Sequence, residues 1–158
     1  MRVRGATIED LGTILALNAF VQRQHAEALP RLFKLPRDSQ QSVDAFNAIL
    51  KAPESLVLLA EDAVPVGYLY AQFQNRPAGW AHLASRVLYI QHMVIAPQFR
   101  RQGVGTLLLS GAMDAARSNK IGRVELDVWA FNSEAKRFYA KHGFEVFNER
   151  MQLSINGA

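Results

Sequence analysis

The stretch IAPQFRRQGVGTLLL, residues 95–109, gives the clearest indication of how this chain folds. Its apolar start predicts the end of a strand, Pro97 stops that strand, and helical spacing begins at Val104. Gly103 and Gly105 let the connecting backbone adopt a positive φ and approach a ligand closely. The first N–H groups of a helix have no intrahelical partner, and the helix dipole adds positive potential there. The stretch therefore predicts a strand, a loop and a helix N-terminus that suit a pyrophosphate.

Two arginines, Arg100 and Arg101, add full positive charges to this loop. Other phosphate-binding motifs fit less well. The string GxxxxGK[ST] of a P-loop does not occur, and Leu108 stands where a dinucleotide-binding fingerprint has its third glycine. A simpler interpretation stays open, in which the glycines ease a strand-to-helix turn and the arginines are solvated.

Outward from this loop, the sequence predicts alternating helices and strands. Thr7 is an expected helix N-cap, and Asp10 three residues later approximates a capping box. The order predicts an α/β (α+β) fold around one mixed sheet. Helices are expected over residues 8–28, 42–51, 104–116 and 132–142, and strands over residues 2–6, 55–62, 64–74, 86–97, 123–129, 144–147 and 150–155.

Length and composition limit the class of protein. A chain of 158 residues, 49% hydrophobic and 20% charged, predicts one globular domain over residues 1–158. The absence of cysteine excludes a disulfide framework, a cysteine-ligated zinc site and an acyl-cysteine mechanism. The net charge of +4 suits an anionic small molecule, and the arginines are spread along the chain rather than gathered in a nucleic-acid-binding stripe.

The N-terminal segment does not read as a signal peptide, because Glu9 and Asp10 interrupt its apolar region. No apolar run approaches the ~18–20 residues that a membrane span requires. We therefore expect a cytoplasmic protein without a membrane or nucleic-acid partner.

A second informative stretch is FNSEAKRFYAKHGFE, residues 131–145, whose aromatic residues taken alone are ordinary core positions. The two stretches together are more specific. RxxGxG at residues 100–105 resembles the acetyl-CoA signature of the GNAT N-acetyltransferase superfamily, and NxxAxxFYxKxGF at residues 132–144 resembles the segment that follows it. The strand and two helices predicted at the N-terminus and the hairpin predicted over residues 55–74 also match, so the resemblance covers essentially the whole chain.

This resemblance implies a single GNAT-like domain. Its central sheet is expected to be mixed, mostly antiparallel and twisted, with about four flanking helices and strands that splay apart at the acetyl-CoA site. The implied reaction is direct transfer of an acetyl group from acetyl-CoA to a primary amine in a ternary complex, without a metal. The implied acceptor is a small-molecule, peptide or protein amine, and the chain is expected to be a monomer or homodimer.

The resemblance also implies which positions bind the cofactor. Backbone N–H groups of the loop would hold the pyrophosphate, and the main chain of the preceding strand would pair with pantetheine. An N–H group, that of Val94, would face the developing oxyanion. Asn132 would contact the CoA arm, although it suits a helix N-cap equally well. The implied residues are Met93, Val94, Ile95, Arg100, Arg101, Gln102, Gly103, Val104, Gly105, Thr106 and Asn132.

The resemblance implies one catalytic position, and a departure from the family pattern leaves the second to the residues themselves. Tyr139 stands where the family often places the general acid that protonates the departing thiolate, and an aromatic wall for the CoA arm is the alternative. Many family members carry a carboxylate on the strand before the loop, but residues 89–92 hold none. His92 is therefore the candidate base, because an imidazole titrates near pH 6.5. A partly buried structural histidine is the alternative role, and other candidate bases are His25, Glu27, Glu61 and Asp62.

The acceptor side of the family is walled by the first two helices, their connecting loop and strands near the hairpin. This implies His25, Phe33 and Tyr68 as substrate-binding residues, with Glu27 and Asp38 as carboxylates that would attract a cationic amine. The alternative function is a non-catalytic module that binds or senses acyl-CoA.

Overall fold

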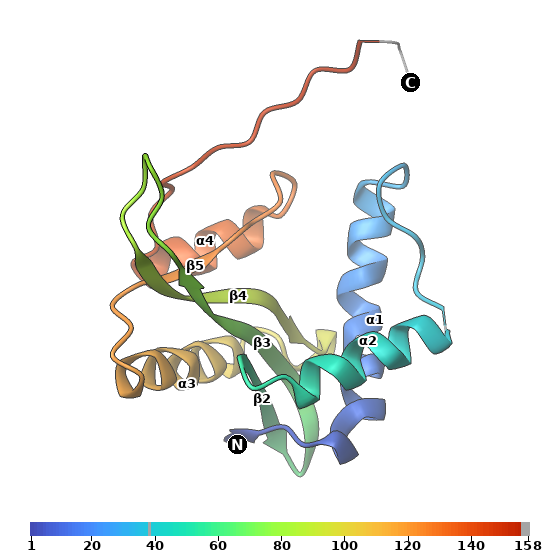
Figure 1. The fold of residues 1–158 in the computed structure, drawn as a ribbon. Helices are drawn as coiled ribbons and strands as arrows, with labels where there is room; N and C mark the ends of the chain where they lie inside the picture. Colours follow the sequence, from blue (N-terminus) through green and yellow to red (C-terminus); the bar gives the residue numbers. More distant parts are fainter. Residues whose placement is uncertain (38, 156–158) are drawn as a thin grey trace. The chain divides into compact units, whose positions relative to one another are not determined.

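The computed structural model describes residues 1–37 and 39–155. Its internal contacts divide the chain into two units, Met1–Asp127 and Val128–Ala158. The first unit contains a five-stranded sheet and the helices α1, α2 and α3 (Figure 1). The second unit contains α4 (Ser133–Lys141).

The sheet has the strand order β1-β2-β3-β4-β5. Each of the first three neighbouring pairs is antiparallel, whereas β5 runs parallel to β4. This is the mixed, mostly antiparallel sheet that the sequence predicts. The strands are β1 (Arg2–Gly5), β2 (Ser55–Asp62), β3 (Val64–Arg76), β4 (Ser85–Ile95) and β5 (Val124–Leu126).

Helices cover both faces of the sheet. On one face, α1 (Leu11–Ala28) and α2 (Gln40–Lys51) place Ile14 and Phe46 in a buried cluster with Tyr68 of β3. On the other face, α3 (Val104–Ser118) brings Gly111 next to Leu58 of β2. Because successive side chains of a strand point to opposite faces, the apolar runs of β2 and β3 fill both layers.

A charged cluster fixes the entry into α1. A short 3-10 turn, Ile8–Asp10, precedes the helix, and Thr7 N–H donates to the Asp10 carboxylate at 2.8 Å. Arg4 makes two hydrogen bonds to the same carboxylate, at 2.7 and 2.8 Å, and also pairs with Glu61 of β2 at 2.7 Å. The predicted capping box is confirmed, and the arginine ties it to the sheet.

An irregularity in β4 sets the direction of its side chains. Tyr70 of β3 lies opposite His92, but the next residue, Ala71, lies opposite Ile90. Gln91 is therefore an extra residue, and such a β-bulge re-aims the side chains that follow it. As a result, His92 shares the face of Tyr70, toward α1 and α2.

The strands β3 and β4 approach each other closely where β4 ends. Gly67 lies opposite Ile95, and a Cβ built on Gly67 would lie 2.7 Å from the carbonyl oxygen of Val94. Only glycine allows this approach without moving the backbone.

The second unit confirms the predicted helix over residues 132–142. The Asn132 side chain accepts a hydrogen bond from Ala135 N–H at 3.0 Å and caps α4. Gly143, with φ of 84°, follows the helix in the left-handed conformation. The Tyr139 ring packs against those of Phe138 and Phe144, with centroids 5.2 and 5.4 Å away.

Several boundaries differ from the sequence prediction. The second helix begins at Gln40 rather than Ser42, because Ser39 caps it. The strand predicted over residues 123–129 is shorter, since β5 covers only Val124–Leu126. On α3, the side chain of Leu107 is 37% exposed, whereas those of Leu108 and Leu109 are buried.

The two predicted closing strands, residues 144–147 and 150–155, are wrong for the structure as described: no strand is formed there. Alternating apolar residues make a strand only where a neighbouring strand completes the hydrogen-bond ladder, and these residues have none in the described chain. Their large apolar side chains are strongly exposed: Val146 80%, Phe147 77%, Met151 92%, Leu153 87% and Ile155 86%.

Candidate functional site

The loop between β4 and α3 has an unusual backbone. Arg101 has φ of 61° and Gly103 has φ of 83°, so both residues are left-handed. A non-glycine residue rarely adopts this conformation, and such turns direct successive N–H groups into a concave, anion-binding surface. The predicted strand, loop and helix are therefore confirmed, with a loop geometry that suits a phosphate.

The N-terminus of α3 opens directly onto this loop. Leu107 N–H donates to the Gly103 carbonyl at 3.0 Å, at the start of the helical ladder. The N–H groups of Val104 and Gly105 precede this bond and have no intrahelical acceptor. Thr106 lies exposed in the same first turn. The positive end of the helix dipole therefore coincides with the loop.

The loop side chains add charge around these N–H groups. Arg100, Arg101 and Gln102 are exposed. The Arg100 guanidinium reaches the carbonyl of Ile95 at 3.4 Å, and the Gln102 amide donates to the carbonyl of Gln98 at 2.9 Å. Arg101 and Arg100 thus stand beside the helix N-terminus, as predicted for a site that attracts an anion.

The end of β4 has an open main-chain edge. Pairing with β5 stops at Ile90, so β4 continues to Ile95 without a ladder partner on that side in the first unit. On the β3 side, Ala96 N–H donates to the Val66 carbonyl at 2.9 Å. N–H groups alternate between the two edges of a strand. The N–H groups of Met93 and Ile95 therefore point to the open edge, whereas that of Val94 points toward β3.

This alternation bears on the predicted cofactor contacts. The N–H groups of Met93 and Ile95 face the open edge, whereas the Ile95 carbonyl accepts from the Arg100 guanidinium. Pairing of this edge with pantetheine, which the resemblance implies, stays a prediction. The Val94 N–H is directed away from that edge, which speaks against its predicted role at the oxyanion. The bulge at Gln91 is the cause, because it shifts the alternation by one residue.

His92 has aromatic rings around it on the face of the sheet that α1 and α2 cover. Its Nδ1 is 3.3 Å from the Tyr68 hydroxyl, which accepts a hydrogen bond from the Asn18 amide at 2.8 Å. The rings of Tyr70 and Phe46 lie 5.8 and 6.2 Å from the imidazole. Burial lowers the pKa of His92, and the neighbouring His25 lowers it further. The imidazole is therefore neutral near neutral pH and able to accept a proton.

A family model described as "Acetyltransferase (GNAT) family" matches residues 20–144. The chain belongs to this family. It is also 30% identical to the aminoalkylphosphonate N-acetyltransferase of Salmonella typhimurium, over 97% of this chain and 90% of that protein. Together these matches identify an N-acetyltransferase. The chain spans only 40% and 33% of two further curated relatives that it matches.

Solved structures share the fold of this GNAT protein. The tetramutant of the BH1408 protein from Bacillus halodurans superposes with a TM-score of 0.92 at 24% identity, over 98% of this chain and 100% of that one. AAC(6')-Iy in complex with the bisubstrate analogue CoA-S-monomethyl-acetylneamine has a TM-score of 0.75 at 16% identity, over 96% and 95% of the two chains. The predicted GNAT fold is thereby confirmed.

On the predicted acceptor side of this GNAT protein, the imidazole of His25 packs on Phe33 with centroids 4.9 Å apart. The Gln22 amide donates to the Lys34 carbonyl at 2.6 Å and ties the α1–α2 loop to α1. Burial lowers the pKa of His25. Tyr68, the third predicted substrate residue, is fully buried, and its hydroxyl lies 3.3 Å from Nδ1 of His92. Asp38 lies outside the described residues.

Two of the carboxylates considered as bases are engaged elsewhere. Glu61 pairs with Arg2 and Arg4, and the hydrogen bond from Arg4 lowers its pKa. Asp62 pairs with the N-terminal amine at 3.5 Å. Both lie with β1 at the opposite edge of the sheet from β5, so neither supports the role of base.

In the second unit of this GNAT protein, Tyr139 is held among aromatic rings, and burial raises the pKa of its hydroxyl to about 12. Its phenol therefore keeps its proton at neutral pH, as a general acid must. The Asn132 side chain is engaged as the cap of α4, the alternative role that the sequence left open. Its contact with CoA stays a prediction.

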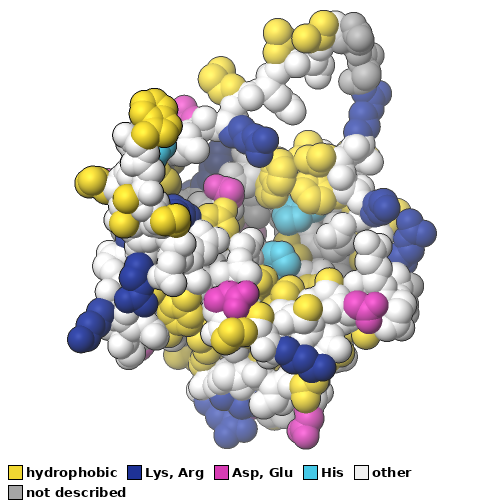
Figure 2. Space-filling view, in the orientation of Figure 1, with side chains coloured by type: hydrophobic (Ala, Val, Ile, Leu, Met, Phe, Trp, Pro, Cys, Tyr) yellow, Lys and Arg dark blue, Asp and Glu magenta, His cyan; other side chains and the backbone are white. Residues whose placement is uncertain are grey.

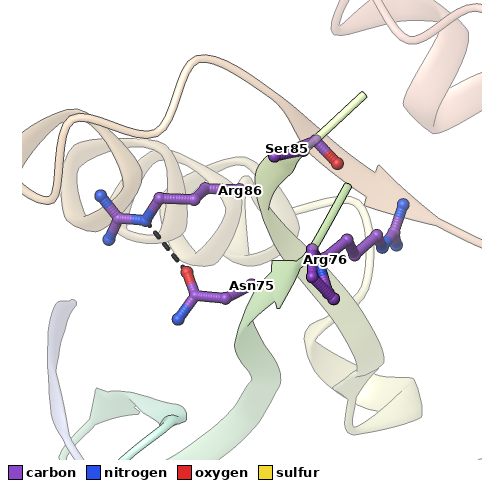
Figure 3. A pocket seen from close by; sticks show the side chains of 6 residues that line it. Asn75, Arg76, Ser85 and Arg86 are labelled. Atoms are coloured by element: carbon purple, nitrogen blue, oxygen red, sulfur yellow. Dashed lines mark hydrogen bonds between the residues drawn. The ribbon is translucent and has the colours of Figure 1, made fainter. Parts of the chain in front are cut away.

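A hollow of about 370 Å³ at the outer end of the β3–β4 hairpin is separate from this site (Figure 3). Arg76, Ser85 and Arg86 contribute to it, and Arg86 donates to Asn75 at 3.1 Å. Because β3 and β4 are antiparallel, this end is remote from Gly67. On the face drawn in Figure 2, lysine and arginine side chains form separate groups rather than one stripe.

The described residues contain no cluster of three or more His, Cys, Asp or Glu side chains suited to a metal ion. None of their helices has the length and apolar content to span a bilayer.

Sequence reasoning missed Asn18, Tyr70 and Gly67. The apolar spacing of α1 places Asn18 one turn after Ile14, and a polar residue on the buried face of a helix is a usable signal. The roles of Tyr70 and Gly67 depend on the register of β3 against β4, which the sequence does not specify.

Proposed function

We propose that this N-acetyltransferase moves an acetyl group from acetyl-CoA directly to the amine of a small molecule in a ternary complex. The observation that carries the proposal is the junction of β4 and α3. There the open main-chain edge at Met93 and Ile95 leads into the left-handed loop at Arg101 and Gly103.

Each part of this junction suits one part of the cofactor. An extended pantetheine arm with two amides pairs with the main chain of Met93 and Ile95 as an added strand would. The N–H groups of Val104 and Gly105, with the helix dipole, suit the pyrophosphate. Arg100 and Arg101 add charges that attract the anionic cofactor.

The remaining residues suit the chemistry of the transfer. An alkylammonium acceptor, with a pKa of ~10.4, must lose a proton before it attacks. His92 accepts that proton, a C–N bond forms and the C–S bond of the thioester breaks. The main-chain N–H of Met93 or Ile95 stabilises the charge on the carbonyl oxygen. The departing sulfur must also gain a proton, and the role of Tyr139 as its donor stays a prediction.

The charges on the acceptor side favour an amine that also carries an anionic group. The segment 22–39, which holds the end of α1 and the following loop, has four cationic residues, Arg23, Arg31, Lys34 and Arg37, against the two carboxylates of Glu27 and Asp38. The Salmonella relative is described as acting on aminoalkylphosphonates, which combine an amine with such a group. We propose the same class of acceptor here. A cytoplasmic location and a monomer or homodimer stay predictions.

Release of free CoA tests the proposal. The chain has no cysteine, so a thiol reagent such as DTNB reports CoA without a protein background. We expect turnover with aminoalkylphosphonates that exceeds turnover with diamines and aminoglycosides of equal amine content. Acetyl-CoA binding without turnover on any amine would contradict the proposal and indicate an acyl-CoA-binding module.

A further inference from the structure

Three side chains from three elements form one hydrogen-bonded chain beneath α1. Asn18 of α1 donates through Nδ2 to the Tyr68 hydroxyl of β3 at 2.8 Å, and that hydroxyl lies 3.3 Å from Nδ1 of His92 on β4. Tyr68 is 0% exposed, so these two partners account for its hydroxyl within the described residues. The chain therefore links a buried amide to the candidate base through one phenol.

The number of polar hydrogens on these three side chains limits the directions in which their hydrogen bonds can run. Burial raises the pKa of Tyr68 far above 10, so its hydroxyl always has one hydrogen to donate. With Asn18 as the donor, that hydrogen points to Nδ1 of His92, and the neutral ring carries its own hydrogen on Nε2.

The hydrogen bonds among these three side chains can also run in the opposite direction, with each donor becoming an acceptor. If the Asn18 amide turns over, its Oδ1 accepts from Tyr68 and the Tyr68 oxygen accepts from Nδ1–H of His92. Nε2 then has a lone pair. An amide is the side chain that supports both directions, because it contains a donor and an acceptor.

We propose that Asn18 is a positioning residue for acetyl transfer: its amide, acting through Tyr68, selects which ring nitrogen of His92 carries the proton. In one direction Nε2 donates a hydrogen bond, and in the other it accepts the proton of the incoming amine. That proton then leaves the imidazolium for solvent after turnover. The transfer of a proton from the amine to His92 rests on the proposed function. The tautomer of His92 is a property of the free protein.

The surroundings of His92 make its tautomer, rather than its charge, the variable that matters. The titratable groups that face the ring are His25 on α1 and the phenols of Tyr68 and Tyr70 on β3, while α2 contributes the apolar ring of Phe46. Both histidine pKa values are lowered by burial, so both rings are neutral at neutral pH.

The substitution Asn18→Asp fixes the direction of the hydrogen bonds that link this position to Tyr68 and His92. A carboxylate only accepts, so Tyr68 must donate to it and His92 must carry its hydrogen on Nδ1. Nitrogen-15 NMR of the imidazole distinguishes the two tautomers in the free protein. We expect Nε2–H in the parent and Nδ1–H in Asn18→Asp. Since the carboxylate also favours the imidazolium, the acid limb of the kcat/KM profile should move up by about one pH unit.

Two further variants separate an effect that passes through these hydrogen bonds from a general effect of the added negative charge. Asn75→Asp adds the same charge roughly 23 Å away along β3, at a residue that already accepts from Arg86, and should change neither the tautomer nor the profile. Tyr68→Phe removes the link, so adding Asn18→Asp to it should leave the tautomer unchanged.

The proposal is overturned if His92 keeps Nε2–H in Asn18→Asp, or if Asn75→Asp moves the profile equally. It is also overturned if Asn18→Asp still switches the tautomer in the Tyr68→Phe background. A parent protein that releases no CoA with any amine refutes the proposed function, while the NMR result still decides the tautomer.

Discussion

Replacing Gly67 by alanine tests the link between the fold and the cofactor edge. The added Cβ would lie 2.7 Å from the Val94 carbonyl oxygen, whereas ordinary contacts begin at 3.4 Å, so roughly 0.7 Å of displacement is required. The atom in the way is main chain, so a side-chain rotation cannot relieve the contact. Overpacking of this kind costs about 1–3 kcal/mol of unfolding free energy.

The expected result of Gly67→Ala is a fall in Tm of about 2–12 °C, since one kcal/mol corresponds to about 2–4 °C for a chain of this size. The displaced strand also holds the main chain of Ile95, so kcat/KM for acetyl-CoA should fall about tenfold or more. Thermal unfolding and the CoA-release assay measure the two effects.

Gly111→Ala is the matched control. Its Cβ would lie 3.1 Å from a methyl of Leu58, which is the flexible end of a side chain, and alanine favours the helix by about 1 kcal/mol over glycine. We expect a Tm within about 2 °C of the parent. If Gly67→Ala is as stable and as active as Gly111→Ala, the close approach of β3 and β4 does not position the cofactor edge.

Three other predictions follow from single positions. Gly103→Val should raise KM for acetyl-CoA and cost about 1–2 kcal/mol, because φ is 83° there; an unchanged KM would argue against a role for this turn. Hydrogen bonds from Arg4 lower the Asp10 pKa from 3.8 to about 2, so their contribution is complete above pH 3.8 and lost as pH falls toward 2; Asp10→Asn should remove this slope in urea unfolding, and an unchanged slope contradicts it. Leu153→Lys should change stability by less than about 0.5 kcal/mol, because Leu153 is 87% exposed; a larger loss would indicate that the segment packs as a strand.

The sequence predicted those features that depend on local signals. Gly103 and the change of period at Val104 located the start of α3, and Asn132 and Gly143 bounded α4. The hairpin of β2 and β3 also followed, with the turn at Ala63. In each case the residue that fixes the backbone lies within a few positions of the element.

Features that depend on pairing between distant residues were not predictable. The bulge at Gln91 decides that His92 faces α1 and that Val94 N–H faces β3, and it is visible only in the register with β3. The alternation at Met151 and Leu153 resembled a strand, but whether a partner strand is present is not a property of the segment itself. The role of Asn18 depends on the contact between α1 and Tyr68, which the sequence does not specify.

A crystal structure with CoA tests the central claim most directly. The account predicts the pyrophosphate within hydrogen-bond distance of the main-chain N–H groups of Gly103–Thr106, and the pantetheine amides paired with Met93 and Ile95. A pyrophosphate held anywhere else, such as the hollow at Arg76 and Arg86, would contradict it.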